Sequence, residues 1–325
     1  MLSLGVETTA HTFGIGIVTD EGKILVNEKD TYIPPIGKGI IPIDAAKHHE
    51  KVKEKVLAQA LEKSKEKLEN VDVISYSAGP GLPPALRVGA DFAIGISKKY
   101  KKKLIPVNHS LAHLEIGRLT SGTKDPVFVY LSGGNTMIIA YAGGRYRIFG
   151  ETEDIPVGNC FDVVGREMGL PHPGGPEIEK LALNGEYVEL PYVVKGMDLS
   201  FAGIATAATK LFKNGVSKEN ISYSLQETCF AMLTEVTERA MAHTGKKELL
   251  LVGGVAANKR LQEMMKMMCE DRSAKFYVVP SEYSGDQGAM IAWCGILASK
   301  SKWKSEFKDK IKPNWRIDQV KINWL

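Results

Sequence analysis

Two histidines four residues apart, His109 and His113, have the spacing that most readily serves chemistry. They stand in LIPVNHSLAHLEI (104–116), where an apolar stretch typical of a strand runs into a helical pattern. Positions i and i+4 share one face of a helix, so both imidazoles can reach a single metal ion. Alternatively, one histidine caps the helix and the other packs at the surface or in the core. Ligands from elsewhere in the chain must decide between these interpretations.

The composition bounds the class of protein in which such a site would sit. With 325 residues, 44% of them hydrophobic and 25% charged, the chain resembles an ordinary globular protein long enough for two domains. Its four cysteines form no CxxC pair, which favours a reducing compartment and argues against a disulfide frame or a thiolate zinc site. No secretory signal opens the sequence, and no apolar run approaches the roughly 20 residues of a membrane span. We therefore expect a cytoplasmic protein.

The charge of the chain does not identify a partner. A net charge of +4 is too small to indicate a nucleic-acid-binding protein by itself. Lysines cluster in KKYKKK (98–103) and in SKWKSEFKDKIK (301–312), and solvated helix faces or surface loops are the simpler interpretation of both clusters.

The same order of segments occurs twice in the chain. Each copy has a hairpin with a polar tip, then a strand, glycine-rich loop and helix, then a strand ending near a proline, polar residues and a helix. The copies cover 2–27, 71–100 and 103–119, and then 126–150, 247–268 and 275–297. Strands alternating with helices predict an α/β fold, and the duplication predicts two similar domains facing one another across a cleft.

This duplication suggests where further metal ligands come from. The histidine pair begins the last helix of the first copy, and Asp286 stands at the start of the equivalent helix in the second copy. We therefore expect the Asp286 carboxylate to face the imidazoles across the cleft, together with Tyr130 from the second hairpin. Two imidazoles, a carboxylate and a phenol oxygen make a mixed nitrogen and oxygen site suited to iron or zinc.

Other histidines and apolar residues favour structural roles. His48 and His49 are adjacent, so on a helix they point about 100° apart and do not share a metal; we expect surface histidines near a partner or RNA. Apolar residues at helical spacing in 221–244 predict a core helix, with Leu225, Cys229, Met232, Leu233, Val236 and Ala240 on its packed face.

Eight motifs, in this order along the chain, resemble those of the Kae1/TsaD/Qri7 family, the tRNA N6-adenosine threonylcarbamoyltransferases. They are HSLAH, SGGNT, GNCFDVVGREMGL, HPGGPEIEKLA, DLSFAGI, GGVAANKRL and SGDQGAM, with the polar hairpin tips. The resemblance runs from about residue 2 to about residue 300 and favours the archaeal-eukaryotic Kae1 branch. Bacterial relatives usually carry lysine after the Phe-Asp pair, where this chain has Val163, so no role of that lysine is carried over.

The resemblance implies an actin/Hsp70/sugar-kinase-like (ASKHA) fold, with a first domain of residues 1–122 and 298–325 and a second domain of residues 123–297. It implies transfer of a threonylcarbamoyl group from threonylcarbamoyl-adenylate to N6 of adenosine 37 in tRNAs that read ANN codons, with release of AMP. By motif match, one divalent metal per subunit, Fe²⁺ or alternatively Zn²⁺, is held by His109, His113, Tyr130 and Asp286. The family also implies as partners the Bud32 kinase, which some relatives carry fused at the C-terminal side, and Pcc1 and Cgi121 of the KEOPS complex.

The adenylate-binding residues implied by the resemblance are Tyr130, Leu131, Ser132, Gly133, Gly134, Asp162, Gly175, Glu179 and Asn258. Backbone N–H groups of the SGGN turn can cradle a phosphate. Asp162 and Glu179 are acceptors for ribose hydroxyls, and Gly175 lets the backbone lie against the nucleoside. Asn258 either contacts the adenine or sugar or caps the helix that follows it.

Three other functions share parts of this pattern. A metalloprotease of the HExxH class needs a glutamate beside the first histidine, where this chain has Ser110. The ASKHA fold also hosts ATPases and kinases, and nucleotide binding alone does not exclude them. A scaffold within an assembly is the third alternative. The sequence names no catalytic base for the transfer.

Overall fold

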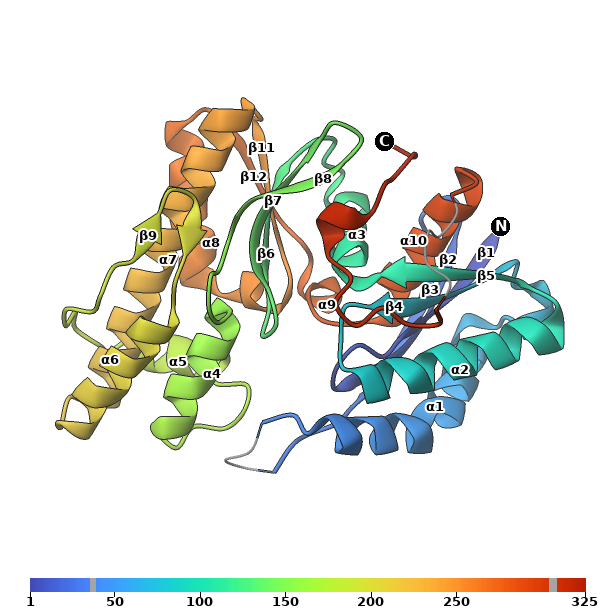
Figure 1. Cartoon of the computed structure of the whole chain (residues 1–325), viewed down its shortest axis with the longest axis horizontal. Helices are drawn as coiled ribbons and strands as arrows, with labels where there is room; N and C mark the ends of the chain where they lie inside the picture. The colour runs from blue at the N-terminus through green and yellow to red at the C-terminus, as the bar shows by residue number, and fades with distance from the viewer. Residues whose placement is uncertain (36–38, 304–308) are drawn as a thin grey trace. The chain divides into compact units, whose positions relative to one another are not determined.

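The computed structural model describes residues 1–35, 39–303 and 309–325. The chain forms two compact units, one made of Met1–Thr120, Gly143–Arg145 and Gly285–Leu325, the other of Ser121–Ala142 and Tyr146–Ser284. Each unit has a five-stranded mixed sheet with helices packed on it (Figure 1). The predicted α/β class is therefore confirmed. In the described part of the chain, no helix is long and apolar enough to cross a membrane.

The first unit is built on a sheet with strand order β3-β2-β1-β4-β5. Strands β1, β2 and β3 are antiparallel neighbours, whereas β4 and β5 run parallel to β1. The elements are β1 (Leu2–Glu7), β2 (Thr12–Thr19), β3 (Ile24–Thr31), α1 (Pro42–Ser64), η1 (Leu68–Asn70), β4 (Val73–Gly79), α2 (Pro83–Tyr100), β5 (Lys103–Asn108), α3 (His109–Ser121), α10 (Gly288–Lys300) and η3 (Ile317–Gln319).

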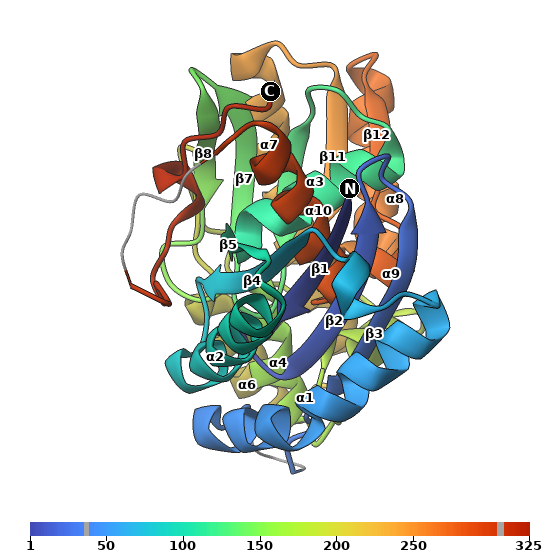
Figure 2. The same cartoon turned by 90° about the vertical axis from the view of Figure 1, so that its right-hand side faces the viewer.

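Helices cover the first sheet on its two faces. Helices α1 and α2 pack against β2, β3 and β4 (Figure 2), and α10 packs against β1, β2 and β4. Glycines allow α10 to lie against the sheet backbone: a Cβ atom on Gly16 would stand 2.1 Å from the backbone nitrogen of Ala289, and one on Gly288 would stand 2.1 Å from that of Gly16. Side chains at these positions would prevent the contact.

This packing corrects the predicted domain boundary. The sequence-based division placed residues 123–297 in the second domain, but the chain re-enters the first unit at Gly285. The reason is the close contact between α10 and the first sheet, which the order of segments along the chain does not reveal. Residues 304–308, part of the second lysine cluster, lie outside the described residues.

The second unit repeats the plan of the first. Its strand order is β12-β11-β6-β7-β8, with β7 antiparallel to β6, and β11 and β12 in parallel pairing. The elements are β6 (Val127–Leu131), β7 (Thr136–Ala142), β8 (Arg145–Glu151), α4 (Val157–Glu167), α5 (Gly175–Ala182), β9 (Val194–Lys195), β10 (Asp198–Leu199), α6 (Ala202–Lys213), α7 (Lys218–Thr244), β11 (Glu248–Val252), η2 (Gly254–Ala257), α8 (Lys259–Asp271), β12 (Lys275–Val278) and α9 (Ser281–Ser284). The predicted duplication is confirmed.

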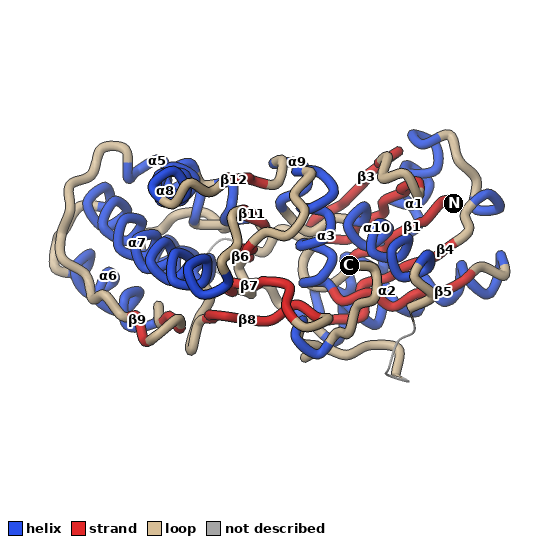
Figure 3. The backbone as a smooth tube through the Cα atoms, turned by 90° about the horizontal axis from the view of Figure 1, so that it is seen from above, coloured by secondary structure: helices blue, strands red, loops and turns tan. Residues whose placement is uncertain are grey.

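The long helix α7 is the centre of the second unit's core. It packs against α5, α6 and α8 and against strands β6 and β7 (Figure 3). All six residues predicted for its packed face are fully buried: Leu225, Cys229, Met232, Leu233, Val236 and Ala240. Several candidate functional residues follow the carboxyl ends of parallel strands, where α/β sheets commonly bind ligands: His109 after β5, Ser132 after β6, Asn258 after β11 and Asp286 after β12.

Candidate functional site

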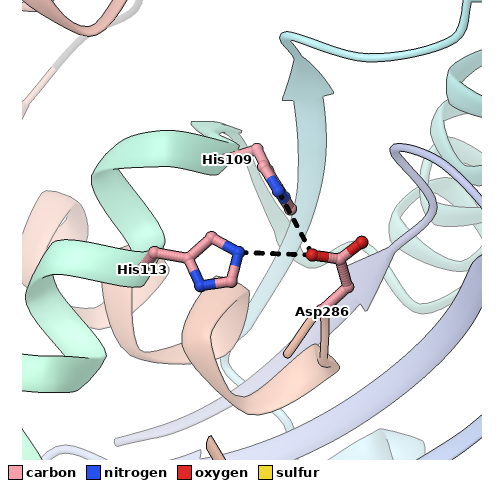
Figure 4. A group of neighbouring side chains, drawn as sticks. All are labelled: His109, His113 and Asp286. Atoms are coloured by element: carbon pink, nitrogen blue, oxygen red, sulfur yellow. Dashed lines mark hydrogen bonds and ion pairs between the residues drawn. The ribbon is translucent and has the colours of Figure 1, made fainter. Parts of the chain in front are cut away.

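His109, His113 and Asp286 meet in the first unit (Figure 4). One ligand atom from each lies within 4.8 Å of the others. The Nε2 atoms of His109 and His113 are 3.4 and 3.3 Å from the same oxygen, Oδ1 of Asp286. The two imidazoles are nearly perpendicular, with ring centroids 4.7 Å apart. Two imidazole nitrogens and a carboxylate oxygen aimed at one point form a donor set that suits a divalent metal.

Local sequence places the two histidines on one face. The Asn108 side chain caps α3, because its Oδ1 accepts a hydrogen bond from the backbone N–H of Leu111 at 3.0 Å. The helix therefore begins at His109, as predicted, and His113 follows one turn later. Asn108 Nδ2 donates to the carbonyl of Trp315 at 2.9 Å, which ties this helix start to the C-terminal segment.

Burial and the neighbouring charges shift the pKa values of His109, His113 and Asp286. Burial favours the neutral His109 ring, but the carboxylates of Glu7 and Asp286 outweigh burial and raise the pKa of His109 to about 9. Burial lowers the pKa of His113. Burial acts upward on Asp286, yet His109 and His113 hold its pKa well below the usual range. Because metal ligands must be deprotonated, a divalent cation bound here would compete with protonation of His109.

The prediction that Asp286 faces the histidines from the other domain is wrong. Asp286 belongs to the first unit, two residues before helix α10 begins. Tyr130, the fourth predicted ligand, belongs to the second unit. Its side chain is fully buried, and its phenol oxygen accepts a hydrogen bond from Asn135 Nδ2 at 3.3 Å.

In the second unit, the SGGN turn follows Leu131 at the end of β6 and is organised by Ser132. The Ser132 hydroxyl oxygen accepts hydrogen bonds from the N–H groups of Gly134 and Asn135, at 3.2 and 3.0 Å. The Ser132 N–H donates to the Asn135 carbonyl at 2.8 Å, so three of the four N–H groups expected to cradle a phosphate are already used within the turn. The space that side chains at Gly133 and Gly134 would fill is open in the described part of the chain, so the turn presents bare backbone.

Helices α4 and α5 and the start of α8 carry the other predicted adenylate residues. Gly158 of α4 lies against the SGGN turn, since a Cβ atom there would be 2.6 Å from the Ser132 carbonyl oxygen. One turn later on α4, Asp162 Oδ1 accepts a hydrogen bond from the Gly174 N–H at 2.7 Å. The next residue, Gly175, begins α5 and has open space where a Cβ would stand.

Glu179 and Asn258 also hold backbone in place. Glu179, one turn after Gly175 on α5, accepts a hydrogen bond from the Lys259 N–H at 2.7 Å. Asn258 caps α8 by accepting from the Leu261 N–H at 3.1 Å, and its Nδ2 donates to Gln226 at 2.9 Å. Asn258 therefore fills the capping role, one of the two roles that the sequence left open. The hydrogen bonds of Asp162 and Glu179 connect these residues to the starts of α5 and α8.

The expectation of two surface histidines at 48 and 49 is wrong for His49. Its side chain is fully buried, and Nε2 lies 3.1 Å from the carbonyl oxygen of Ala10. His48 instead pairs with Asp30 at 3.1 Å. Because His49 lies on the side of α1 that packs against β2, its role is structural.

Comparison with known proteins defines the relationship. The sequence model of the family described as "tRNA N6-adenosine threonylcarbamoyltransferase", TsaD, matches residues 23–293. A curated protein of that name from Thermofilum pendens is 52% identical over 324 residues, which cover 99% of this chain and 96% of the relative. The chain belongs to the tRNA N6-adenosine threonylcarbamoyltransferase family. It is accordingly a transferase that acts on tRNA, and the expected family is confirmed.

One further relative and one solved structure extend the comparison for this threonylcarbamoyltransferase family member. A "probable bifunctional tRNA threonylcarbamoyladenosine biosynthesis protein" from Methanocaldococcus jannaschii is 52% identical over this whole chain, which covers 61% of that longer protein. Among solved structures, HypF of T. kodakarensis aligns with a TM-score of 0.62 at 14% identity, covering 92% of this chain and 48% of that one. The structural likeness supports the expected actin-like fold and nothing finer.

Sequence reasoning missed Glu7 and Thr9 of the VETT segment. Glu7 is fully buried, and its Oε2 lies 3.0 Å from Nδ1 of His109. The signal was present in the sequence, because a glutamate ends the otherwise apolar strand LSLGVE. An ionisable group at the end of a buried strand needs a partner.

Proposed function

We propose that this family member transfers the threonylcarbamoyl group of threonylcarbamoyl-adenylate to N6 of adenosine 37 in tRNAs that read ANN codons. The N6 amino group attacks the carbamoyl carbonyl carbon, a carbon–nitrogen bond forms, and the bond from that carbon to the phosphate oxygen breaks. AMP leaves, and the amino group gives up one proton. The single observation that carries this proposal is identity of 52% over nearly the whole chain to a transferase of that name.

The proposal includes a divalent metal ion held by His109, His113 and Asp286. The observation that supports it is the convergence of both Nε2 atoms on Oδ1 of Asp286. When bound, such an ion supplies a Lewis acid that orients an oxygen ligand and stabilises developing negative charge. We propose Fe²⁺, with Zn²⁺ as the alternative, because both accept mixed nitrogen and oxygen ligands. The family resemblance adds the Tyr130 phenol oxygen as a further ligand, and Tyr130→Phe tests it.

We further propose that the adenylate binds in the second unit, at Tyr130–Gly134, Asp162, Gly175, Glu179 and Asn258. Asp162 and Glu179 each use one carboxylate oxygen on a backbone N–H, and the second oxygen of Asp162 lies 3.6 Å from Nδ1 of His172. Each carboxylate oxygen can accept more than one hydrogen bond, so both side chains can also accept from a ribose hydroxyl. The open backbone at Gly133, Gly134 and Gly175 gives the nucleotide room for close approach. With Gly134 and Asn135 N–H groups engaged, we expect the phosphate to use the Gly133 N–H.

Partners complete the proposal. The bifunctional relative is consistent with a Bud32 kinase that acts beside a domain like this one, and Pcc1 and Cgi121 are proposed from the family resemblance. A cytoplasmic location is part of the same proposal. The chain is proposed to bind tRNA weakly by itself, because its net charge is only +4.

The test is transfer of labelled threonylcarbamoyl from the adenylate to tRNA, with and without Bud32, Pcc1 and Cgi121. Nucleoside mass spectrometry should find the modified adenosine at position 37, and a matched tRNA with guanosine 37 should stay unmodified. Phosphate release from ATP without any tRNA modification would instead favour an ATPase. Cleavage of peptides would favour a protease, although Ser110 stands where the HExxH class has its glutamate.

A further inference from the structure

Glu7 is a buried carboxylate to which the proposed transfer reaction assigns no role. It ends the central strand β1 and has no solvent exposure. A charged group in such a place is costly unless several donors surround it. The hydrogen-bond partners of the Glu7 carboxylate therefore indicate its role.

Thr9 holds one oxygen of this carboxylate. The backbone N–H of Thr9 donates to Oε1 of Glu7 at 2.7 Å, and the Thr9 hydroxyl donates to the same oxygen. Two donors on one oxygen fix the plane of the carboxylate and direct the other oxygen, Oε2, away from Thr9. Oε2 lies 3.0 Å from Nδ1 of His109.

This contact determines which nitrogen of His109 can bind a metal. An ionised carboxylate only accepts hydrogen bonds, so Nδ1 must carry a proton. Nε2 is then the nitrogen left available to a metal ion, and it is the one that lies 3.4 Å from Oδ1 of Asp286. The Nε2 atom of His113 lies 3.3 Å from the same oxygen. The hydrogen bond from Nδ1 to Glu7 thus leaves Nε2 of His109 facing Asp286, together with Nε2 of His113.

We propose that Glu7 is a positioning residue for the metal group, which fixes the tautomer and the orientation of His109 through the Nδ1–H···Oε2 hydrogen bond, with Thr9 holding the carboxylate in place. The proposal rests on the proposed metal binding by His109, His113 and Asp286. Metal-binding histidines commonly donate their second N–H to a carboxylate, and loss of that acceptor typically weakens metal binding by about 10- to 100-fold.

The variant Glu7→Gln tests whether Glu7 acts as the hydrogen-bond acceptor of His109 or only fills space in the core. The amide keeps the size of the side chain, but only one of its two ends accepts a hydrogen bond. The two Thr9 donors favour the amide oxygen on their side, so the NH₂ group faces His109. Nδ1 must then act as the acceptor, the ring proton moves to Nε2, and the metal-binding lone pair is lost.

A matched control comes from the same unit. Glu115 on α3 is also a buried carboxylate, 2% exposed, and it accepts hydrogen bonds from Arg118 at 3.0 Å and Trp324 at 3.1 Å. Glu115→Gln removes a buried negative charge two residues from His113, yet it leaves the Glu7–His109 hydrogen bond in place. Thr9→Val is an intermediate variant: it removes one of the two donors to Oε1 and a hydroxyl that lies 3.3 Å from Nδ1 of His109, but keeps the backbone donor and the Glu7 carboxylate.

The experiment measures the Kd for Zn²⁺ by chelator competition in the full chain and in each variant, with circular dichroism and thermal unfolding as the check on folding. We expect Glu7→Gln to raise the Kd about 10- to 100-fold, Thr9→Val to raise it less, and Glu115→Gln to leave it unchanged. In the Zn²⁺-loaded wild type, ¹⁵N NMR should show the His109 proton on Nδ1, with the signal assigned by its loss in His109→Ala.

Each outcome decides one of the two proposals. If Glu7→Gln folds and binds Zn²⁺ as tightly as the wild type, Glu7 has no positioning role, although the metal site stands. If Glu7→Gln does not fold, an unchanged Kd in Thr9→Val together with an unprotonated Nδ1 in the wild type overturns the proposal. If the wild type itself binds no Zn²⁺ at stoichiometric concentration, the metal proposal fails and the role of Glu7 fails with it.

Discussion

In the first unit, side chains of His109, His113 and Asp286 face one another, whereas in the second unit Asp162, Glu179 and Asn258 are tied to backbone N–H groups. The first arrangement is ready to receive an ion, because its donor atoms already converge. The second arrangement fixes loops and helix starts and leaves bare backbone at Gly133, Gly134 and Gly175. Side chains of the first unit are therefore arranged as candidate ligands, and those of the second unit shape the backbone.

The largest effect is expected from removing ligands of the first unit. The double variant His109→Ala, His113→Ala loses two of the three candidate ligands, so the purified chain should contain no bound Fe²⁺ or Zn²⁺. Threonylcarbamoyl transfer should fall roughly 10²- to 10³-fold, since Lewis-acid stabilisation is worth several kcal/mol. Elemental analysis and the transfer assay measure both results. Full metal occupancy in the double variant would contradict the site.

The single variants sharpen this test. His109→Ala leaves Glu7 buried without its charged partner, which should lower the free energy of unfolding by roughly 3–5 kcal/mol. His113→Ala leaves that pair intact. Urea unfolding of both variants should therefore show the larger loss for His109→Ala, and His113→Ala is the cleaner variant for metal binding. Equal losses would mean that the Glu7–His109 pair does not stabilise the first unit.

The response to acid should also differ between the units. Burial and the neighbouring His48 lower the pKa of His49, in the first unit, to about 4. The unfolded chain binds this proton more tightly, with a pKa of about 6.5, so stability falls as the pH drops from about 6.5 to about 4, by up to about 3 kcal/mol. His49→Gln should flatten that part of the pH profile of the unfolding free energy.

The second unit supplies the contrast. Burial acts upward on Asp154, but hydrogen bonds from Phe201, Ser200, Ala202 and Ile155 lower its pKa to about 2. Its contribution is present above about pH 4 and is lost only as the pH falls toward about 2. Hydrogen exchange at pH 4.5 should therefore find the first unit loosened before the second. The reverse order would refute the assignment of His49.

A smaller effect is expected from the adenylate residues. Gly175→Val should weaken adenine-nucleotide binding by steric overlap with the ligand, because its Cβ meets no protein atom within 4 Å. Glu179→Ala should weaken binding about 10- to 100-fold through loss of a charge-assisted acceptor. Isothermal titration with a non-hydrolysable adenylate measures both. Metal content should not change in either variant.

A control separates binding from structure at Glu179. Glu179→Gln keeps an oxygen for the Lys259 N–H but loses the charge, so it should bind more weakly than the wild type and more tightly than Glu179→Ala. Unchanged affinity in Gly175→Val and Glu179→Ala together would mean that the nucleotide binds elsewhere.

The smallest effect is expected from the first lysine cluster. Lys102 donates to the Glu69 carbonyl at 2.6 Å and Lys103 to the Ser299 hydroxyl at 3.2 Å, so these ammonium groups are partly engaged. Reversing the charge of Lys101, Lys102 and Lys103 should change the slope of log K for tRNA against log salt by about one at most. If the slope measured in the assembled complex instead falls by an amount that corresponds to several phosphate contacts, this cluster is a tRNA-binding surface.

The sequence predicts local structure well where one signal dominates. The hairpin predicted within 2–27 and the helix predicted to begin at the histidine pair are found in those segments, as β1, β2, β3 and α3. The packed face of α7 is likewise correct, because a buried face must repeat with the helical period. The duplicated plan is visible because strands, glycine loops and helices recur in order.

The sequence did not predict which segments far apart along the chain pack against one another. Asp286 was assigned to the wrong unit, because order along the chain does not tell which sheet a helix packs against. Gly14 and Gly16, alternate residues of β2 that both lie close to the α10 segment, were the available clue. Glu7 was missed since its partner His109 is 102 residues away, and His49 was missed because its burial depends on packing against β2.

Removal and return of the metal test whether threonylcarbamoyl transfer requires the ion proposed to bind at His109, His113 and Asp286. The full chain, with the partners needed for turnover, is stripped by a chelator, assayed for threonylcarbamoyl transfer to tRNA, reloaded with Fe²⁺ or Zn²⁺, and assayed again. Transfer should disappear on stripping and return on reloading in the wild type, and reloading should restore nothing in the double variant His109→Ala, His113→Ala. Full transfer by the metal-free wild type, with metal absence verified by elemental analysis, would show that transfer needs no metal ion.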